Sequence, residues 1–145
     1  MAFSTSGLYV TTFRDVFDTS QTALNLDATT HMCALHTDSR VNNFSSDTTW
    51  ANTAEVSSAN YTTKGLALTG TSVTESPTGT LMWDSTLNPS WTPVTFTAYG
   101  AIVFADVLAD EMICAVAFGG PYTATAGTFT LTWNTLGIFT IDLTP

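Results

Sequence analysis

The sequence has little charge, and almost none of it is positive. Only 10% of the residues are charged, against roughly 25% in a typical soluble domain. Three Lys and Arg stand against twelve Asp and Glu, which gives a net charge of −9. The basic residues Arg14, Arg40 and Lys64 are far apart in sequence, whereas nucleic-acid-binding proteins cluster such residues to neutralise phosphates. We therefore expect no direct binding of nucleic acid and no adhesion to an anionic membrane.

Long apolar runs are also missing. No stretch approaches the roughly 18 consecutive apolar residues of a transmembrane helix. Residues 1–7 lack the basic and apolar regions of a secretory signal. These features predict a protein that is made in a cytoplasm and has no membrane partner. A length of 145 residues predicts one domain over residues 1–145, because domains commonly run roughly 100 to 150 residues.

Cysteine is scarce, and both copies lie in apolar surroundings. Cys33 follows Met32 and precedes Ala34 and Leu35, and Cys114 lies within residues 112–116. Cytoplasmic disulfides are rare, and free cysteine is commonly buried as a small hydrophobic residue. The sequence favours two buried free thiols, with a disulfide between them as the alternative.

Side chains that carry out catalysis are few as well. His31 and His36 are the only ordinary general bases, and neither accompanies a Gly-x-Ser-x-Gly nucleophile elbow. Together with Cys33 they could supply three metal ligands, but on a strand His31 and Cys33 share one face while His36 points away. Core or solvent-edge histidines are the simpler interpretation.

The acidic residues do not follow a calcium-binding pattern. Asp106, Asp110 and Glu111 cluster in an expected turn, and Asp15 and Asp18 lie near the N-terminus. Calcium loops need oxygens at defined spacing, which is not found here, and no glycine-rich phosphate loop occurs either. The sequence thus predicts a protein that is not an enzyme, with no metal and no cofactor.

Threonine takes the place of the missing charge, with about thirty copies. It is β-branched and suits the pleated surface of a sheet. Within residues 128–134, Phe129, Leu131 and Trp133 share one face and threonines occupy the other, as in a half-buried antiparallel strand. Further short strand-like segments separated by turn residues predict an all-β fold, an antiparallel β-sandwich or jelly-roll-like arrangement of about eight strands. These segments span residues 23–27, 31–37, 65–74, 79–84, 93–99, 100–105, 112–118, 128–134 and 137–144.

Turn signals set the expected connections. Residues 75–79 contain Pro77 and Gly79 and predict a hairpin, and Gly119-Gly120-Pro121 predicts a turn after residues 112–118. The continuous apolar run 100–105 is typical of a strand that is buried on both faces.

One segment has a helical period instead. Tyr9, Phe13, Val16 and Phe17 recur at intervals of four, three and one and draw an apolar stripe. They predict a short N-terminal helix within residues 7–18, capped by a serine or threonine of residues 4–6.

The tryptophans divide into two groups. Trp83 and Trp133 lie in alternating strands and are expected in the core. Trp50 lies in the irregular segment 41–61, where Asp47 could cap a single helical turn, and Trp91 has polar and proline neighbours. These two are candidates for interface anchors, or for a platform that stacks on sugars.

Four segments in order resemble the small Thr-rich virion structural proteins of tailed bacteriophages, a group of capsid decoration and tail proteins. They are Phe3-x-x-x-Gly7-Leu8-Tyr9-Val10; Glu55-Val56-Ser57-x-x-x-Tyr61-Thr62-x-x-Gly65-x-x-Leu68-Thr69-Gly70; Tyr99-Gly100-Ala101-Ile102-Val103-Phe104; and Gly127-Thr128-Phe129-Thr130-Leu131-x-Trp133 with Gly137-Ile138-Phe139-Thr140. The central segment departs from the group's Glu-Val-x-Gly-x-Gly-Tyr pattern at Ser58 and Ala59-Asn60.

The resemblance implies a capsid decoration, or cement, protein on the surface of the virion. Such a protein would bind the major capsid protein as a homotrimer and stabilise the head after synthesis in the host cytoplasm. The first alternative is a tail tube or minor tail protein. The second is a carbohydrate-binding β-sandwich that exposes Trp50 and Trp91.

A decoration role predicts where the chain meets its partners. Terminal segments order readily on a partner, and a large aromatic residue in a polar loop is costly to expose. Deletion of residues 2–7 is expected to weaken capsid binding and leave the fold intact. The expected interface residues are Phe3, Leu8, Tyr9, Phe13, Trp50 and Trp91.

Overall fold

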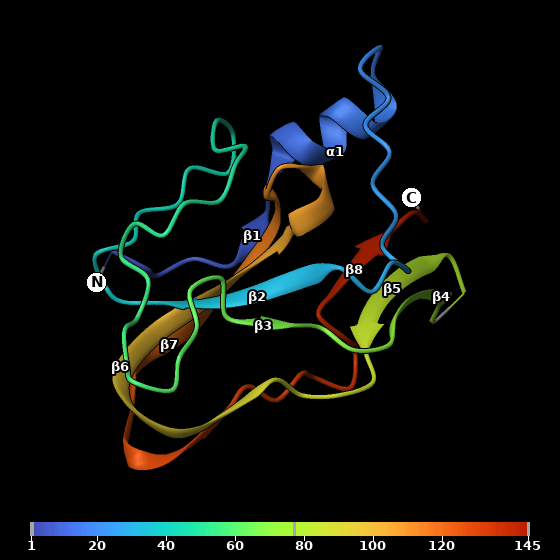
Figure 1. The fold of residues 1–145 in the computed structure, drawn as a ribbon. Helices are drawn as coiled ribbons and strands as arrows, with labels where there is room; N and C mark the ends of the chain where they lie inside the picture. The colour runs from blue at the N-terminus through green and yellow to red at the C-terminus, as the bar shows by residue number, and fades with distance from the viewer. Residues whose placement is uncertain (1, 77, 145) are drawn as a thin grey trace.

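Two antiparallel sheets and one short α-helix make up the protein in a computed structural model, which describes residues 2–76 and 78–144 (Figure 1). The expected all-β, sandwich-like fold of about eight strands with an N-terminal helix is confirmed. The five-stranded sheet has the order β1 (Gly7–Leu8), β7 (Glu111–Thr130), β6 (Ser90–Ala105), β2 (His31–His36) and β3 (Leu66–Ala67). The three-stranded sheet has the order β4 (Thr71–Glu75), β5 (Thr80–Ser85) and β8 (Phe139–Asp142). The helix α1 spans Val10–Phe17, and a 3-10 turn, η1, spans Asp106–Leu108.

The long antiparallel pair of β6 and β7 is the frame of the larger sheet. β6 joins the two expected strands 93–99 and 100–105 into one. β7 runs through Gly119-Gly120-Pro121, so the turn predicted there is wrong. Ala98 pairs with Tyr122 and Gly100 pairs with Ala117, which leaves four residues of β7 opposite one of β6. Gly119, with a φ of 79°, forms part of a β-bulge rather than a chain reversal.

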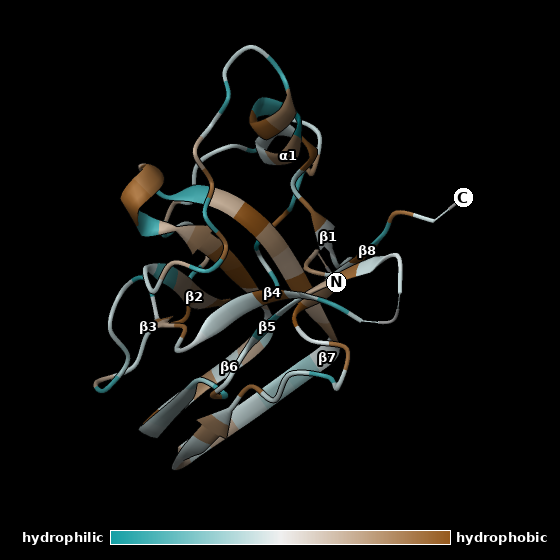
Figure 2. Cartoon of the chain, turned by 90° about the vertical axis from the view of Figure 1, so that its right-hand side faces the viewer, coloured by the Kyte–Doolittle hydropathy of each residue, from teal (hydrophilic) through white to brown (hydrophobic). Residues whose placement is uncertain are grey.

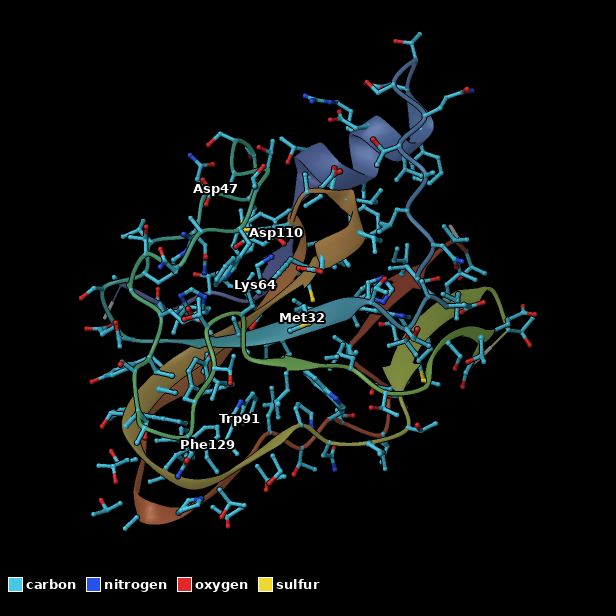
Figure 3. The ribbon with its side chains drawn as sticks, viewed as in Figure 1. Met32, Asp47, Lys64, Trp91, Asp110 and Phe129 are labelled. Atoms are coloured by element: carbon cyan, nitrogen blue, oxygen red, sulfur yellow. The ribbon has the colours of Figure 1, made fainter. Side chains whose placement is uncertain are left out.

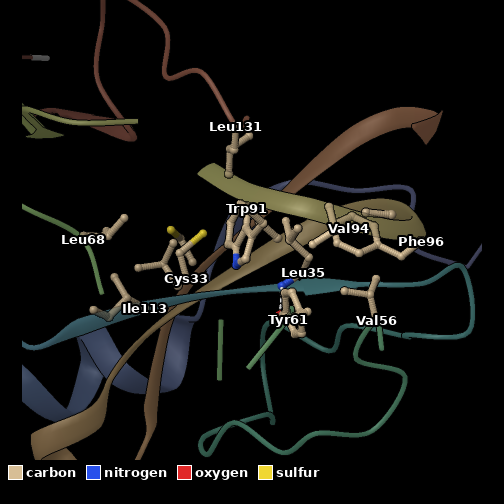
Figure 4. Close-up of a cluster of buried hydrophobic side chains, with 14 of the residues drawn as sticks. Cys33, Leu35, Val56, Tyr61, Leu68, Trp91, Val94, Phe96, Ile113 and Leu131 are labelled. Atoms are coloured by element: carbon tan, nitrogen blue, oxygen red, sulfur yellow. Dashed lines mark hydrogen bonds between the residues drawn. The ribbon is translucent and has the colours of Figure 1, made fainter. Parts of the chain in front are cut away.

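The C-terminal end of β6 is buried on both faces, as the run 100–105 predicted. Ala101, Val103 and Ala105 face the main core between the two sheets, and Ile102 and Phe104 face a second cluster. The main core contains Trp83 of β5 and the side chains of Figure 4, among them Trp91 and Phe96. Trp83 is 1% exposed, which confirms its predicted place in the core.

The second cluster is covered by the N-terminal segment and by the loop 41–61. Phe3, Tyr9 and Trp50 lie in it together with Ile102 and Phe104. The indole of Trp50 stacks on Phe104 with ring centroids 4.7 Å apart. A side chain at Gly100 would come within 2.2 Å of the Phe3 ring, so Gly100 makes room for Phe3.

Polar contacts hold this loop in place. The Nε1–H of Trp50 donates to Nε2 of His36 at 3.1 Å. The helical turn expected after Asp47 does not form, because the Asp47 carboxylate accepts from the backbone N–H of Asn43 and pairs with Arg40.

Three further expectations need correction. Residues 23–27 form no strand; Leu24 and Leu26 lie in irregular chain packed against the main core. The expected strand 65–74 breaks between β3 and β4, where buried Leu68 donates its N–H to His31 and Gly70 has a φ of 64°. The helix has no side-chain cap, since its N-cap residue is Tyr9, next to β1.

The hairpin predicted around residues 75–79 is confirmed by the β4–β5 pairing, from Thr71–Ser85 to Glu75–Leu81. Its Pro77 lies outside the described residues. Over residues 2–76 and 78–144, no helix has the length and apolar character needed to cross a membrane.

Both cysteines are buried and free, as predicted. Cys33 of β2 and Cys114 of β7 pair with Val103 from opposite sides, so β6 lies between them. Neighbouring strands are roughly 4.8 Å apart, which puts the two Cα atoms beyond the usual disulfide range. Burial raises the pKa of both thiols, to about 12 for Cys114.

Phe3 is expected to be a stability residue. Its ring is fully buried against Gly100, so Phe3→Ala should lower the free energy of unfolding by about 3 to 5 kcal/mol. Urea denaturation measures this change. Ser4→Ala, at an exposed neighbouring position, is the control and should change it by less than about 0.5 kcal/mol. Equal effects would show that the N-terminal segment does not belong to the core.

His36 should make stability depend on pH. Burial lowers its pKa to about 4, whereas an unfolded histidine titrates near about 6.5. Between these values the unfolded chain binds a proton that the folded chain does not, so the free energy of unfolding falls as pH falls, by up to about 3 kcal/mol. Urea denaturation at pH 7 and pH 4.5 measures the loss. His36→Gln keeps an acceptor for Trp50 and should reduce the loss; an unchanged loss would assign it to other groups.

Candidate functional site

Four of the six expected interface residues belong to the core instead. Phe3 and Tyr9 are fully buried, Trp50 is 6% exposed and Trp91 is 3% exposed. None of the four is exposed in the folded chain: Phe3, Tyr9 and Trp50 lie in the second cluster, where the N-terminal segment and the loop 41–61 cover the larger sheet, and Trp91 lies in the main core. Deletion of residues 2–7 would therefore remove part of the core along with any surface contact.

Trp50 and Trp91 do not form a shared platform. Trp50 lies in the second cluster and Trp91 in the main core, on opposite faces of the larger sheet. Trp91 packs against Tyr61, with ring centroids 6.0 Å apart. It also packs against Phe129, with ring centroids 6.2 Å apart (Figure 3). The carbohydrate-binding alternative required both tryptophans on one exposed face, and the fold does not provide this. Trp133 is partly buried against the main core.

The two histidines lie on opposite sides of β2, as the strand period predicted. His31 contacts the edge of Trp83, with ring centroids 5.2 Å apart, while His36 contacts Trp50. Both are buried, and desolvation lowers the pKa of each. Within residues 2–76 and 78–144, no three His, Cys, Asp or Glu side chains converge as metal ligands would.

Each of the three basic side chains is paired with a carboxylate of this chain. Lys64 Nζ lies 2.7 Å from a carboxylate oxygen of Asp106 and lowers the pKa of that carboxyl group. It lies 2.7 Å from a carboxylate oxygen of Asp110 as well (Figure 3). Arg40 pairs with Asp47 at 3.3 Å. Two of the three acids expected in the turn, Asp106 and Asp110, are thus bound to Lys64, whereas Glu111 is the first residue of β7.

Arg14 is the third basic side chain that pairs with carboxylates of this chain. Its guanidinium lies 2.8 Å from the Asp15 carboxylate and 3.9 Å from that of Asp18. The basic charge of the chain is therefore used in internal pairs, and the remaining surface charge is acidic.

Helix α1 packs with its threonines inward and part of its apolar stripe outward. Thr11 and Thr12 are buried, whereas Val10 is 57% and Phe17 is 85% exposed. The Thr12 hydroxyl donates to the carbonyl oxygen of Met112 at 2.5 Å, and the Thr11 hydroxyl donates to that of Asp47 at 2.8 Å. These bonds satisfy backbone acceptors of β7 and the loop 41–61, and they fix the rotation of the helix.

An apolar groove of about 380 Å³ lies between α1 and β8. The ring of Phe13, which lines the groove, meets Phe139 of β8 in an edge-to-face contact with centroids 6.0 Å apart. Figure 2 shows α1 beyond β1 and β8 at one end of the molecule. We call this feature the α1 groove; it is lined by Leu8, Val10, Phe13, Arg14, Phe17 and Ile141.

The α1 groove includes two of the predicted interface residues and adds others. Leu8 and Phe13 were expected at an interface and line the groove, each partly buried. Val10, Phe17 and Ile141 were missed. The apolar stripe of the helix contained a signal for Phe17, but a stripe by itself is more often a core-facing feature, and the sequence does not reveal that threonines take the inner face.

A second apolar hollow, of about 250 Å³, is lined by residues of the bulge in β7, of the C-terminal end of this strand and of the chain just after it. Phe118, Tyr122, Phe129 and Leu131 line it, and Tyr122 is 57% exposed. Here β7 is an edge strand, since β1 pairs only with its residues Cys114 and Ala115. We call this feature the β7 hollow.

Comparison of the chain with protein-family models, with curated proteins and with solved structures found no match. The α1 groove is therefore assessed on its own geometry: an exposed apolar surface beside a free sheet edge, suited to docking a protein partner.

Proposed function

We propose that this chain is a non-catalytic structural protein of a phage virion, a capsid decoration protein that binds the major capsid protein and stabilises the head. The α1 groove carries the proposal. A helix that buries threonines and exposes Phe17 leaves apolar surface that a partner can cover. The resemblance of four sequence segments to Thr-rich virion proteins indicates that this partner is the major capsid protein.

The β7 hollow is the surface that a homotrimer could use. The β7 hollow and the α1 groove share no lining residue. The hollow would therefore hold copies of this chain together while the groove binds the shell. The resemblance to virion proteins implies a trimer that covers joints between capsomers.

A tail component is the second candidate, and the open edge of β7 favours it. Beyond Ala117, the described partner of this strand is β6 on one side only. Strands with such an edge can pair with a neighbouring copy, and ring-shaped tail assemblies could be joined in this way.

Location in the particle separates the two candidates. We expect cryo-electron microscopy of the native virion to show this chain over three-fold or quasi-three-fold joints of the capsid. Density in the tail would favour the second candidate, and absence from the virion would refute both.

The α1 groove should be required for binding to the shell. Phe17→Glu puts a charge at a position that is 85% exposed, so the fold should persist while affinity for empty shells falls at least tenfold. Co-sedimentation with shells measures the affinity. Val41→Glu, at a position that is 69% exposed and outside the groove, is the matched control and should bind normally. Equal binding by the two variants would exclude the groove as the docking surface.

A further inference from the structure

We propose that the α1 groove binds an extended segment of the partner protein in which apolar residues alternate with Lys or Arg, and that this segment adds as a strand to the free edge of β8. The inference rests on the proposed function and names the chemistry by which the partner is recognised.

The free edge of β8 supplies the backbone part of this site. β8 is last in its sheet and pairs with β5. The N–H of Leu143 donates to Gly79 at 2.9 Å, and hydrogen-bonded pairs alternate along an antiparallel ladder. Phe139 and Ile141 therefore bond to β5, which leaves the N–H and C=O groups of Thr140 and Asp142 directed to the outer edge. An added strand would pair with these groups.

The groove supplies the side-chain part. Val10, Phe13 and Phe17 present an apolar surface from α1, and Leu8 and Ile141 continue it onto β1 and β8. Side chains of a strand alternate between its two faces. The side chains on one face of the added strand would therefore lie against α1 and bury Phe17. The side chains on its other face would stay near water.

Charge decides between a foreign segment and a second copy. Arg14, the charged residue that lines the groove, is already paired with two carboxylates, those of Asp15 and Asp18, which leaves an excess of negative charge beside it. A second copy would bring another net charge of −9, with its basic side chains held in the same internal pairs. A segment with Lys or Arg at its outward positions is complementary to this negative charge.

Two synthetic peptides test the proposal directly. The probe is a ten-residue, end-blocked, fluorescein-labelled peptide that alternates lysine and valine; the control has the same composition in two blocks. We expect fluorescence anisotropy to show at least tenfold tighter binding of the alternating peptide, with an affinity that falls as salt rises. Equal binding of both peptides would show attraction by charge alone and overturn the proposal.

A pair of variants at Thr140 tests the backbone contact. Thr140→Pro removes an outward N–H and leaves the ladder to β5 intact, because proline is tolerated on a free edge. It should weaken binding of the alternating peptide at least fivefold, whereas Thr140→Ala keeps the N–H and should bind normally. Hydrogen exchange of wild-type protein provides a second readout: the amides of Thr140 and Asp142 should become protected when peptide is added. Equal affinities of the two variants, or no protection, would overturn strand addition.

Other outcomes separate this proposal from the proposed function. Self-association that Phe17→Ser abolishes would show that a second copy occupies the groove, and it would overturn the choice of partner. Shell binding that depends on Phe17 but not on the Thr140 N–H would keep the function and refute strand addition. Peptide binding as expected, with the chain absent from virions, would keep the site and refute the function.

Discussion

Burial of β6 on both faces is the constraint on which the rest of the structure depends. Residues Ala101 to Ala105 have essentially no exposed surface, so each face of the larger sheet needs its own cover. The three-stranded sheet, with Trp83, covers one face. In residues 2–76 and 78–144 no further sheet covers the other face, and the N-terminal segment and the loop 41–61 cover it instead.

This unequal cover explains why the helix lies as it does. The carbonyl oxygens of Met112 in β7 and of Asp47 in the loop 41–61 are buried or partly buried and need donors, and the hydroxyls of Thr12 and Thr11 supply them. The rotation that makes these bonds turns Phe17 outward. The apolar surface of the α1 groove is thus a consequence of how the larger sheet is covered. The same hydrogen bonds that hold α1 against the sheet turn its apolar residues toward a partner.

The few charged side chains help to hold the irregular segments in place. Lys64 ties an irregular segment to the turn after β6 through the carboxylates of Asp106 and Asp110. Arg40 pairs with Asp47 inside its own irregular segment and contacts the sulfur of Met112 in β7. Buried polar side chains do the same, since Tyr61 accepts from the N–H of Leu35 and donates to Glu55. Loops held in this way can be part of the core without regular structure. The acids left over give the surface its charge, and with it the preference for a basic partner.

The sequence by itself determined the β class, most of the strands, the doubly buried run 100–105, the position of the helix and the burial of both cysteines. Each of these follows from local composition or from the period of apolar residues, which a single segment contains. The tertiary structure decided the burial of Trp50 and Trp91, the bulge at Gly119 and the outward face of α1. Trp50 is buried because a loop distant in sequence from β6 folds onto Phe104, and α1 is rotated by acceptors on Asp47 and Met112. Such contacts join residues far apart in the chain, so no local pattern records them.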